Sequence, residues 1–333
     1  MVKWIKRLLK GAVVLLLAAL VAGIGYEQWS RWSVARTVSP SGILYDVDGR
    51  RSHLHCSGDG VPTVILEAGL YPGGSLSWSN IYPDLAEGSR VCSYDRAGIM
   101  WSQSRDEPRD AFNIANELHA LLGAASESPP YVLVGHSLGG VLVRVFDHRF
   151  PGEVVGFVFV DSSHPEQNQR LSPEPAEAGL PSPLLIKALS AIGVLRLMYG
   201  SSRPEALPEH AAAAFAALFP QSINGAMREI AALDAILDQS AETGPLGDRP
   251  IVVLTAGRNP DYPDQLPPGV DRWQKVEREL QAELAALSTN SDHRVVPNAS
   301  HDIHWDEPSA VVVGVHDVVD AVRNGAVVRR EDG

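Results

Sequence analysis

Residues 131–140 read YVLVGHSLGG, and this stretch decides the fold prediction. Residues 131–134 form a short apolar run typical of a buried strand, and the chain from Leu138 onward has helical apolar periodicity. The two are joined by Gly135 to Gly139 (GHSLG), a Gly-x-Ser-x-Gly pattern. In so tight a turn the serine adopts a strained backbone conformation, and the two glycines leave room for the crossing chain. Ser137 is then held above the sheet at a helix N-terminus, where negative charge is favoured.

Similar alternation of apolar runs and helical patterns extends from Leu44 to Arg323. We predict eight strands, at residues 44–47, 51–56, 63–67, 90–94, 131–134, 154–160, 251–255 and 293–296, and core helices at residues 76–86, 111–125, 138–149, 273–287 and 308–323. This order indicates an α/β domain, with a mostly parallel sheet and helices on both faces. Asp48-Gly49-Arg50 separates the first two strands, and Asp-Gly is a strong hairpin signal, so that pair should be antiparallel.

One block interrupts the alternation, because residues 162–249 contain no convincing strand. The block begins Pro-rich and then shows helical patterns at residues 183–198, 208–218 and 223–237. We predict that residues 162–249 form a helical lid between strands 6 and 7, with residues 37–161 and 250–333 forming the core. A plain structural excursion is the alternative.

Composition excludes several classes of protein. The chain has 333 residues, 45% of them hydrophobic, and a formal net charge of −12. This length is ample for a buried core, and the apolar fraction is too high for a disordered chain. An acidic balance argues against nucleic-acid binding, which needs a basic surface.

Charge is unevenly distributed along the chain. Residues 1–36 contain six basic residues and one acidic residue, a local charge of +5, which leaves −17 for the remainder. The basic residues flank an apolar run, Gly11 to Tyr26, which with the preceding apolar residues approaches the ~20 residues of a spanning helix. We predict that residues 1–36 are a membrane anchor or a cleaved signal segment, with a linker at residues 33–41. Lysines before the run favour a cytoplasmic N-terminus, so the body would be extracytoplasmic, or secreted after cleavage.

The motifs together resemble those of the α/β-hydrolase superfamily, in particular exported bacterial members with an N-terminal membrane segment. The resemblance covers residues 44–323 and rests on five motifs: residues 67–70 (EAGL), 92–98 (CSYDRAG), 135–140 (GHSLGG), 160–165 (VDSSHP) and 300–304 (SHDIH). It implies an α/β-hydrolase fold with an eight-stranded sheet. It also implies a Ser–acid–His catalytic triad in that chain order, with Ser137 as the nucleophile.

The general base of such a triad follows the last strand. His301 comes directly after the turn at residues 297–300 and is the preferred candidate, with His304 as its rival. His136 and His164 are expected to line or support the site.

The sequence leaves the acid of the triad open. In this family it usually follows the seventh strand, where the chain has Asp261, one residue later than the pattern requires, and Asp264 as an outside candidate. The other position used by the family is the end of the sixth strand, where Asp161 stands. We favour Asp161 over Asp261.

The resemblance also implies an oxyanion hole of two backbone N–H groups, from Leu138 after the nucleophile and from Leu70 after the third strand. The loop at residues 95–102 resembles a family motif in which Met100 replaces a glycine. We interpret it as structural, with Asp95 and Arg96 bracing the loops around Ser137. Contact of Trp101 with the substrate pocket is the alternative role for that residue.

Cys56 and Cys92 are the two cysteines of the chain. The hydrolase sheet places their strands side by side, so they could form a disulfide in an exported body. Two buried apolar side chains are the alternative.

These observations predict a serine hydrolase that acts on a carboxylic ester or similar small-molecule acyl substrate through an acyl-enzyme. No metal or organic cofactor is implied. Amide or peptide hydrolysis of the proline-iminopeptidase type is the alternative chemistry. A hydrolase-like protein that binds ligands without turnover is the alternative from another class. Epoxide hydrolases and haloalkane dehalogenases use aspartate where this chain has serine.

Overall fold

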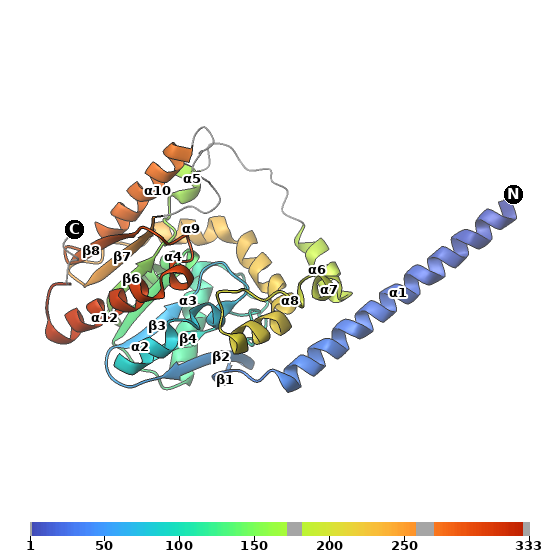
Figure 1. Ribbon diagram of the computed structural model, residues 1–333, viewed down its shortest axis with the longest axis horizontal. Helices are drawn as coiled ribbons and strands as arrows, with labels where there is room; N and C mark the ends of the chain where they lie inside the picture. The colour runs from blue at the N-terminus through green and yellow to red at the C-terminus, as the bar shows by residue number, and fades with distance from the viewer. Residues whose placement is uncertain (1, 172–181, 258–269, 329–333) are drawn as a thin grey trace.

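An eight-stranded sheet forms the centre of the molecule (Figure 1). The computed structural model describes residues 2–171, 182–257 and 270–328. The strands are β1 (Ile43–Val47), β2 (Arg50–Ser57), β3 (Thr63–Glu67), β4 (Val91–Tyr94), β5 (Tyr131–His136), β6 (Val154–Val160), β7 (Ile251–Ala256) and β8 (Ser291–Val296). Their spatial order is β1-β2-β4-β3-β5-β6-β7-β8. All neighbours are parallel except β1 with β2 and β2 with β4. The eight-stranded, mostly parallel sheet and the antiparallel first hairpin are therefore confirmed.

Helices cover both faces of this sheet (Figure 1), because alternate residues of each buried strand point to opposite sides. On one face, Ile65 and Leu133 pack in a cluster with residues of α3 (Ala111–Ala124), α4 (Leu138–Arg149), α9 (Leu233–Ala241) and α10 (Val270–Ala285). On the other face, Val64 and Val132 pack with residues of α2 (Tyr82–Gly88) and α12 (Pro308–Asn324).

The segment between β6 and β7 is helical, as predicted, but its helices begin and end elsewhere. It contains α5 (Gln167–Leu171), α6 (Pro183–Ala191), α7 (Val194–Tyr199), α8 (Glu209–Ala231) and α9. A single expected helix at 183–198 is divided at Gly193, which has φ = 76°, a conformation that glycine adopts without strain. The two helices expected at 208–218 and 223–237 have different bounds, since α8 runs through Pro220.

Tertiary packing explains why α8 continues through a proline, which costs an isolated helix ~3 kcal/mol. Phe215 and Ala226, on either side of the proline, pack on Ile99 and Met100 of the loop after β4. Ser222 accepts a hydrogen bond from Met100 N at 2.8 Å. These contacts hold both halves of α8 against the body.

The last helix of the segment predicted as a lid, α9, packs with the core. Ile236 and Leu237 of α9 are buried in the same cluster as the sheet residue Leu133. Helices α5, α6, α7 and α8 of this segment lie outside the cluster, and residues 182–231, which contain α6 to α8, are called the cap.

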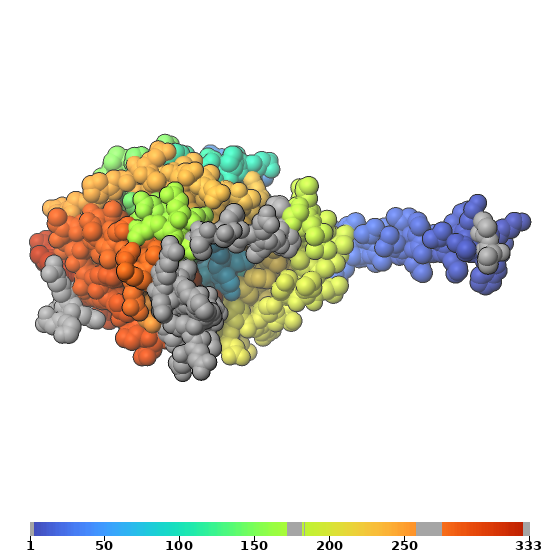
Figure 2. All heavy atoms as spheres, turned by 90° about the horizontal axis from the view of Figure 1, so that it is seen from above, coloured from blue at the N-terminus to red at the C-terminus, as the bar shows by residue number. Residues whose placement is uncertain are grey.

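The N-terminal helix α1 runs without a break from Val2 to Thr37, 36 residues. The linker expected at residues 33–41 is therefore wrong for residues 33–37. Within the described residues, α1 is the one helix long and apolar enough to cross a membrane, and its most apolar window is fully exposed. Figures 1 and 2 show α1 projecting from the body beside α6 and α7.

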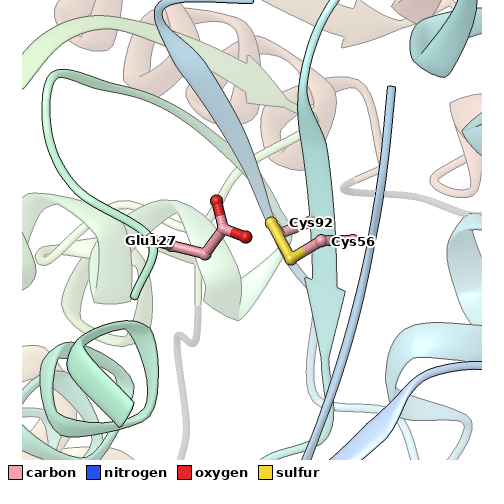
Figure 3. Close-up of side chains that lie close together, drawn as sticks. All are labelled: Cys56, Cys92 and Glu127. Carbon is pink, nitrogen blue, oxygen red and sulfur yellow. A yellow bond between two sulfur atoms is a disulfide. The ribbon is translucent and has the colours of Figure 1, made fainter. Parts of the chain in front are cut away.

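The two cysteines form a disulfide, as predicted (Figure 3). Cys56 of β2 lies directly opposite Cys92 of β4 in the antiparallel register. Glu127, which lies near the two sulfur atoms, forms an ion pair with Arg90.

Candidate active site

Ser137 occupies the turn between β5 and α4, with φ = 50° and ψ = −124°. A non-glycine residue with positive φ is uncommon and marks local strain. The turn is held by the backbone, because Ser137 N donates to Val160 O at 3.1 Å and Ser137 O accepts from Ser163 N at 2.8 Å. The predicted nucleophile therefore has the backbone conformation expected of a tight strand-to-helix turn.

The glycines around Ser137 are required by close approaches of the backbone. A Cβ on Gly135 would lie 2.6 Å from Gly139 O, and a Cβ on Gly139 would lie 2.4 Å from Glu67 O. A Cβ on Gly69 would lie 2.9 Å from Ser137 Cβ. The end of β3 and the loop at Gly69 therefore lie directly against the turn that carries the serine.

Asp161 and His301 are brought together from positions 140 residues apart. Asp161 follows β6, the strand next to β5, and its Oδ2 lies 2.7 Å from His301 Nδ1. Its other oxygen, Oδ1, accepts a hydrogen bond from Ala256 N at 2.9 Å. The Asp161 side chain is buried, whereas that of His301 is 53% exposed. His301 is thus oriented by a buried carboxylate and still reaches solvent.

The surroundings of His301 raise its pKa. Burial lowers the pKa of the ring, but the hydrogen bond and the negative charge of Asp161 outweigh it, and the pKa lies above the ordinary value. Glu277 of α10 also acts on His301. Burial, followed by repulsion from Asp161, raises the pKa of Glu277 to about 7. Sequence reasoning missed Glu277, since nothing in its local pattern distinguishes it from a solvated helix residue.

The rival base, His304, lies elsewhere. It is 1% exposed, and its ring lies 4.9 Å from that of Trp78 and 4.4 Å from that of His136. Burial lowers the pKa of His304 to about 3, so the ring is neutral. His136 is also buried, and its Nε2 lies 3.0 Å from His301 O. The two rings therefore support the segment that carries His301.

A buried arginine holds the loop that follows β3. Arg96 donates from Nη1 to Ala68 O at 2.6 Å and from Nη2 to Gly69 O at 2.7 Å. In a trans peptide the N–H points away from the preceding C=O, so fixing Gly69 O also fixes the direction of the Leu70 N–H. The Leu138 N–H belongs to the first turn of α4, whose N–H groups have no partner within the helix.

Arg96 is itself held by carboxylates from two elements. Glu67 of β3 accepts from Nη1 at 2.6 Å, and Glu229 of α8 accepts from Nη2 at 2.7 Å and from Nε at 2.9 Å. Tyr94 OH donates to Glu67. Burial disfavours the charged guanidinium, but Glu229 and Glu67 raise the pKa of Arg96 well above its ordinary value. Sequence reasoning gave Arg96 a bracing role and missed its link to the cap.

The loop at residues 95–102 is structural, as interpreted from the sequence. Asp95 accepts from Ser75 N at 2.8 Å and pairs with the buried His53 at 2.8 Å. Met100, which replaces a glycine of the family motif, has φ = 42°. Trp101 lines a cavity of about 520 Å³ beside residues 37–41, and this cavity is lined by neither Ser137 nor His301.

Other candidates from the sequence fall in different places. Asp261 and Asp264 lie outside the described residues. His164 lies 3.6 Å from Glu283 of α10. Burial lowers the pKa of His164 despite the charge of that carboxylate.

Three groups of described side chains could hold a metal ion by proximity, since their ligand atoms lie within 4.8 Å of one another: Cys56, Cys92 and Glu127; His136, Asp302 and His304; and His164, Glu166 and Glu283. The disulfide occupies both sulfur atoms of the first group. His136 Nε2 of the second group already contacts His301 O.

The fold and the strand-to-helix serine turn define the class of the protein. The chain belongs to the alpha/beta hydrolase family, whose model matches residues 54–315.

Three known proteins are similar to this chain. The chain is 26% identical over 276 residues to the uncharacterized protein YqjL of Bacillus subtilis (strain 168), covering 82% of this chain and 90% of that protein. A putative epoxide hydrolase from Pseudomonas aeruginosa superposes with a TM-score of 0.62 at 20% identity, covering 86% of this chain and 97% of that chain. A putative lipase from Acinetobacter baumannii AYE superposes with a TM-score of 0.62 at 19% identity, covering 90% and 97%. At these identities the two structures support the fold.

Proposed function

We propose that the protein is a serine hydrolase that cleaves a carboxylic ester or similar acyl substrate. The observation that carries the proposal is the contact of 2.7 Å between buried Asp161 and His301 Nδ1. It lies at the same edge of the sheet as Ser137, because β5 and β6 are parallel neighbours. A serine, an imidazole and a carboxylate in this arrangement suit acyl transfer.

In the proposed reaction, Ser137 Oγ attacks the substrate carbonyl while His301 Nε2 takes the hydroxyl proton. Asp161 holds the proton on Nδ1 and stabilises the imidazolium that forms. The backbone N–H groups of Leu70 and Leu138 donate hydrogen bonds to the developing oxyanion. His301 then protonates the leaving alcohol, and water, deprotonated by His301, hydrolyses the acyl-enzyme.

The experiment that tests the nucleophile is labelling of the full chain with a fluorophosphonate probe. We expect stoichiometric labelling of the native protein, none of Ser137→Ala, and normal labelling of Ser163→Ala, a nearby serine outside the proposed triad. A folded wild-type protein that stays unlabelled would refute the enzyme proposal and favour a ligand-binding protein.

The chemistry of the substrate needs a separate test. A panel of p-nitrophenyl esters of increasing acyl length, run beside aminoacyl p-nitroanilides, separates esterase from peptidase activity. We expect the esters to be preferred, because the cap buries apolar side chains such as Phe215 and Leu218 near the loops around Ser137. Faster turnover of the anilides would favour the amide-hydrolase alternative.

We also propose that α1 is a membrane anchor and that the body is extracytoplasmic. Basic residues precede the apolar run of α1. The disulfide suits an oxidising compartment. Mass spectrometry of the protein extracted from membranes tests retention, since a cleaved signal would leave a chain that lacks residues 1–20 or more.

A further inference from the structure

The cap exposes an unusual number of large apolar side chains on two short helices. This apolar patch consists of five residues of α6 and α7, with exposed fractions from 38% to 79%: Leu184, Leu185, Leu197, Met198 and Tyr199. Single exposed apolar residues are common, but a group of them on two helices that contact each other is a candidate interaction surface.

The contacts that α6 and α7 make with α1 show where the apolar patch lies along α1. Glu27 of α1 is 1% exposed and forms an ion pair of 2.7 Å with Arg196 of α7, which is 7% exposed. The helices also approach closely, because a Cβ on Gly23 would lie 2.5 Å from Ile192 O and a Cβ on Gly193 would lie 3.0 Å from the ring of Tyr26. These contacts fix the patch to α1. The depth of the patch in a membrane is therefore set by the position of α1.

The level of this contact along α1 can be read from the sequence. Gly23 lies in the last turn of the apolar run that ends at Tyr26. Trp29 and Trp32 follow one and two turns later and are 62% and 54% exposed, as in an interfacial aromatic belt. A helix rises 1.5 Å per residue, so Gly23 lies roughly 9 Å deeper than Trp29. The α6–α7 corner thus lies where α1 leaves the hydrocarbon layer.

The charged residues between α1 and α7 are consistent with this position of the α6–α7 corner. Glu27, one residue after the apolar run, would be a costly group at the edge of a bilayer. Arg196 neutralises it, and Arg31 also contacts Glu27, at 2.6 Å. The carboxylate of Glu27 is therefore paired within the contact rather than left unpaired at the edge of the bilayer.

We propose that the apolar patch of α6 and α7 is inserted in the outer leaflet of the same phospholipid bilayer that α1 crosses. The cap then rests on the lipid surface, and the sheet stands above it. This proposal depends on retention of α1 as an anchor, which is part of the proposed function.

The test uses the full chain in phosphatidylcholine vesicles, with the environment-sensitive dye NBD on one introduced cysteine. Cys56 and Cys92 are in a disulfide, so an added cysteine is labelled selectively. Leu197→Cys reports the patch, Val14→Cys in α1 is the membrane reference, and Val313→Cys on α12 is the exposed reference. We expect doxyl-labelled lipid to quench the dye at 197 and at 14, with loss of quenching by aqueous iodide, and the reverse at 313.

Each other outcome overturns the proposal in a distinguishable way. Lipid quenching at residue 14 with iodide quenching at residue 197 leaves the anchor intact and refutes docking. Absence of lipid quenching at residue 14 refutes anchoring itself. A dye at residue 197 that is protected from both quenchers indicates that a second copy of the chain covers the patch.

A charge substitution gives an independent measurement. Leu197 is 73% exposed, so Leu197→Glu should leave the fold intact. It should reduce lipid quenching of NBD at Leu185→Cys, whereas the matched change Val61→Glu, at a 62% exposed site in the loop after β2, should not. Unchanged quenching in a folded Leu197→Glu protein would overturn the proposal.

Discussion

The substitution Asp161→Asn tests the proposed triad most directly, because the structure fixes how the new amide would lie. Asp161 Oδ1 accepts from Ala256 N at 2.9 Å, and only an amide oxygen can replace it there. The amide nitrogen must then face His301 Nδ1, 2.7 Å away in the native protein, and donate to it. His301 would carry its proton on Nε2 and could not accept one from Ser137.

The expected loss is large although the structural change is small. In serine hydrolases the wrong imidazole tautomer lowers kcat by about 10⁴, equivalent to roughly 5.4 kcal/mol of transition-state stabilisation. Folding should be retained, because asparagine has the same shape and, like aspartate, tolerates the positive φ of 40° at residue 161. The assay is steady-state hydrolysis of a p-nitrophenyl ester, with thermal melting to confirm folding and the rate of fluorophosphonate labelling as a second readout.

Asp302→Asn is the matched control. Asp302 is adjacent to His301 in sequence, but its Oδ1 lies 3.8 Å from His136 Nε2, so we expect at most a mild effect. A folded Asp161→Asn protein that keeps kcat within tenfold of the wild type would refute the assignment. Asp261→Asn would then become the decisive variant.

Three further predictions concern pH, the buried arginine and the disulfide. Since the reaction needs neutral His301, kcat/KM should fall as the pH drops through a midpoint above 6.5. Glu277→Gln should shift that midpoint downward, because the negative charge of Glu277 raises the pKa of His301. An unmoved midpoint in the pH profile would contradict the interaction of Glu277 with His301. Arg96→Lys keeps the charge, but lysine cannot hold two loop carbonyls and two carboxylates together. We expect kcat to fall by up to about 10², with folding intact by circular dichroism. An unchanged kcat would argue that Arg96 does not position the loop that carries the Leu70 N–H. Replacing Cys56 and Cys92 by serine opens a link between positions 36 residues apart and should cost about 4 kcal/mol, or about 6 °C in the melting temperature; an unchanged melting curve would show that the crosslink does not stabilise the body.

The sequence predicted the sheet well because its central strands are short, buried on both faces and bounded by polar turns. β5 and β6, for example, begin with apolar residues and are followed directly by Ser137 and Asp161. Prediction failed where tertiary contacts override local preference. Pro220 lies inside α8 because residues on both sides of it pack on the loop after β4.

Only part of the candidate site could likewise be predicted from local sequence. Ser137 and His301 could be proposed from local motifs, whereas Asp161 was favoured over Asp261 by position alone, and its contact with His301 is visible only in the fold. The pairing of Arg96 with Glu229 joins positions 133 residues apart. No local pattern encodes such a contact, so it becomes visible only when α8 is placed over the sheet.

If α1 anchors the protein as proposed, the disulfide has a mechanical consequence. Tension transmitted along α1 would pull on β1, the outermost strand, and then on β2. Strands loaded at a sheet edge unzip one hydrogen bond after another, which takes little force. Separation of the strands would stop at residue 56, where a covalent bond passes the load to β4, the third strand of the sheet. The disulfide would therefore limit mechanical unfolding to the chain between α1 and residue 56, and the part of the sheet that carries Ser137 would stay folded.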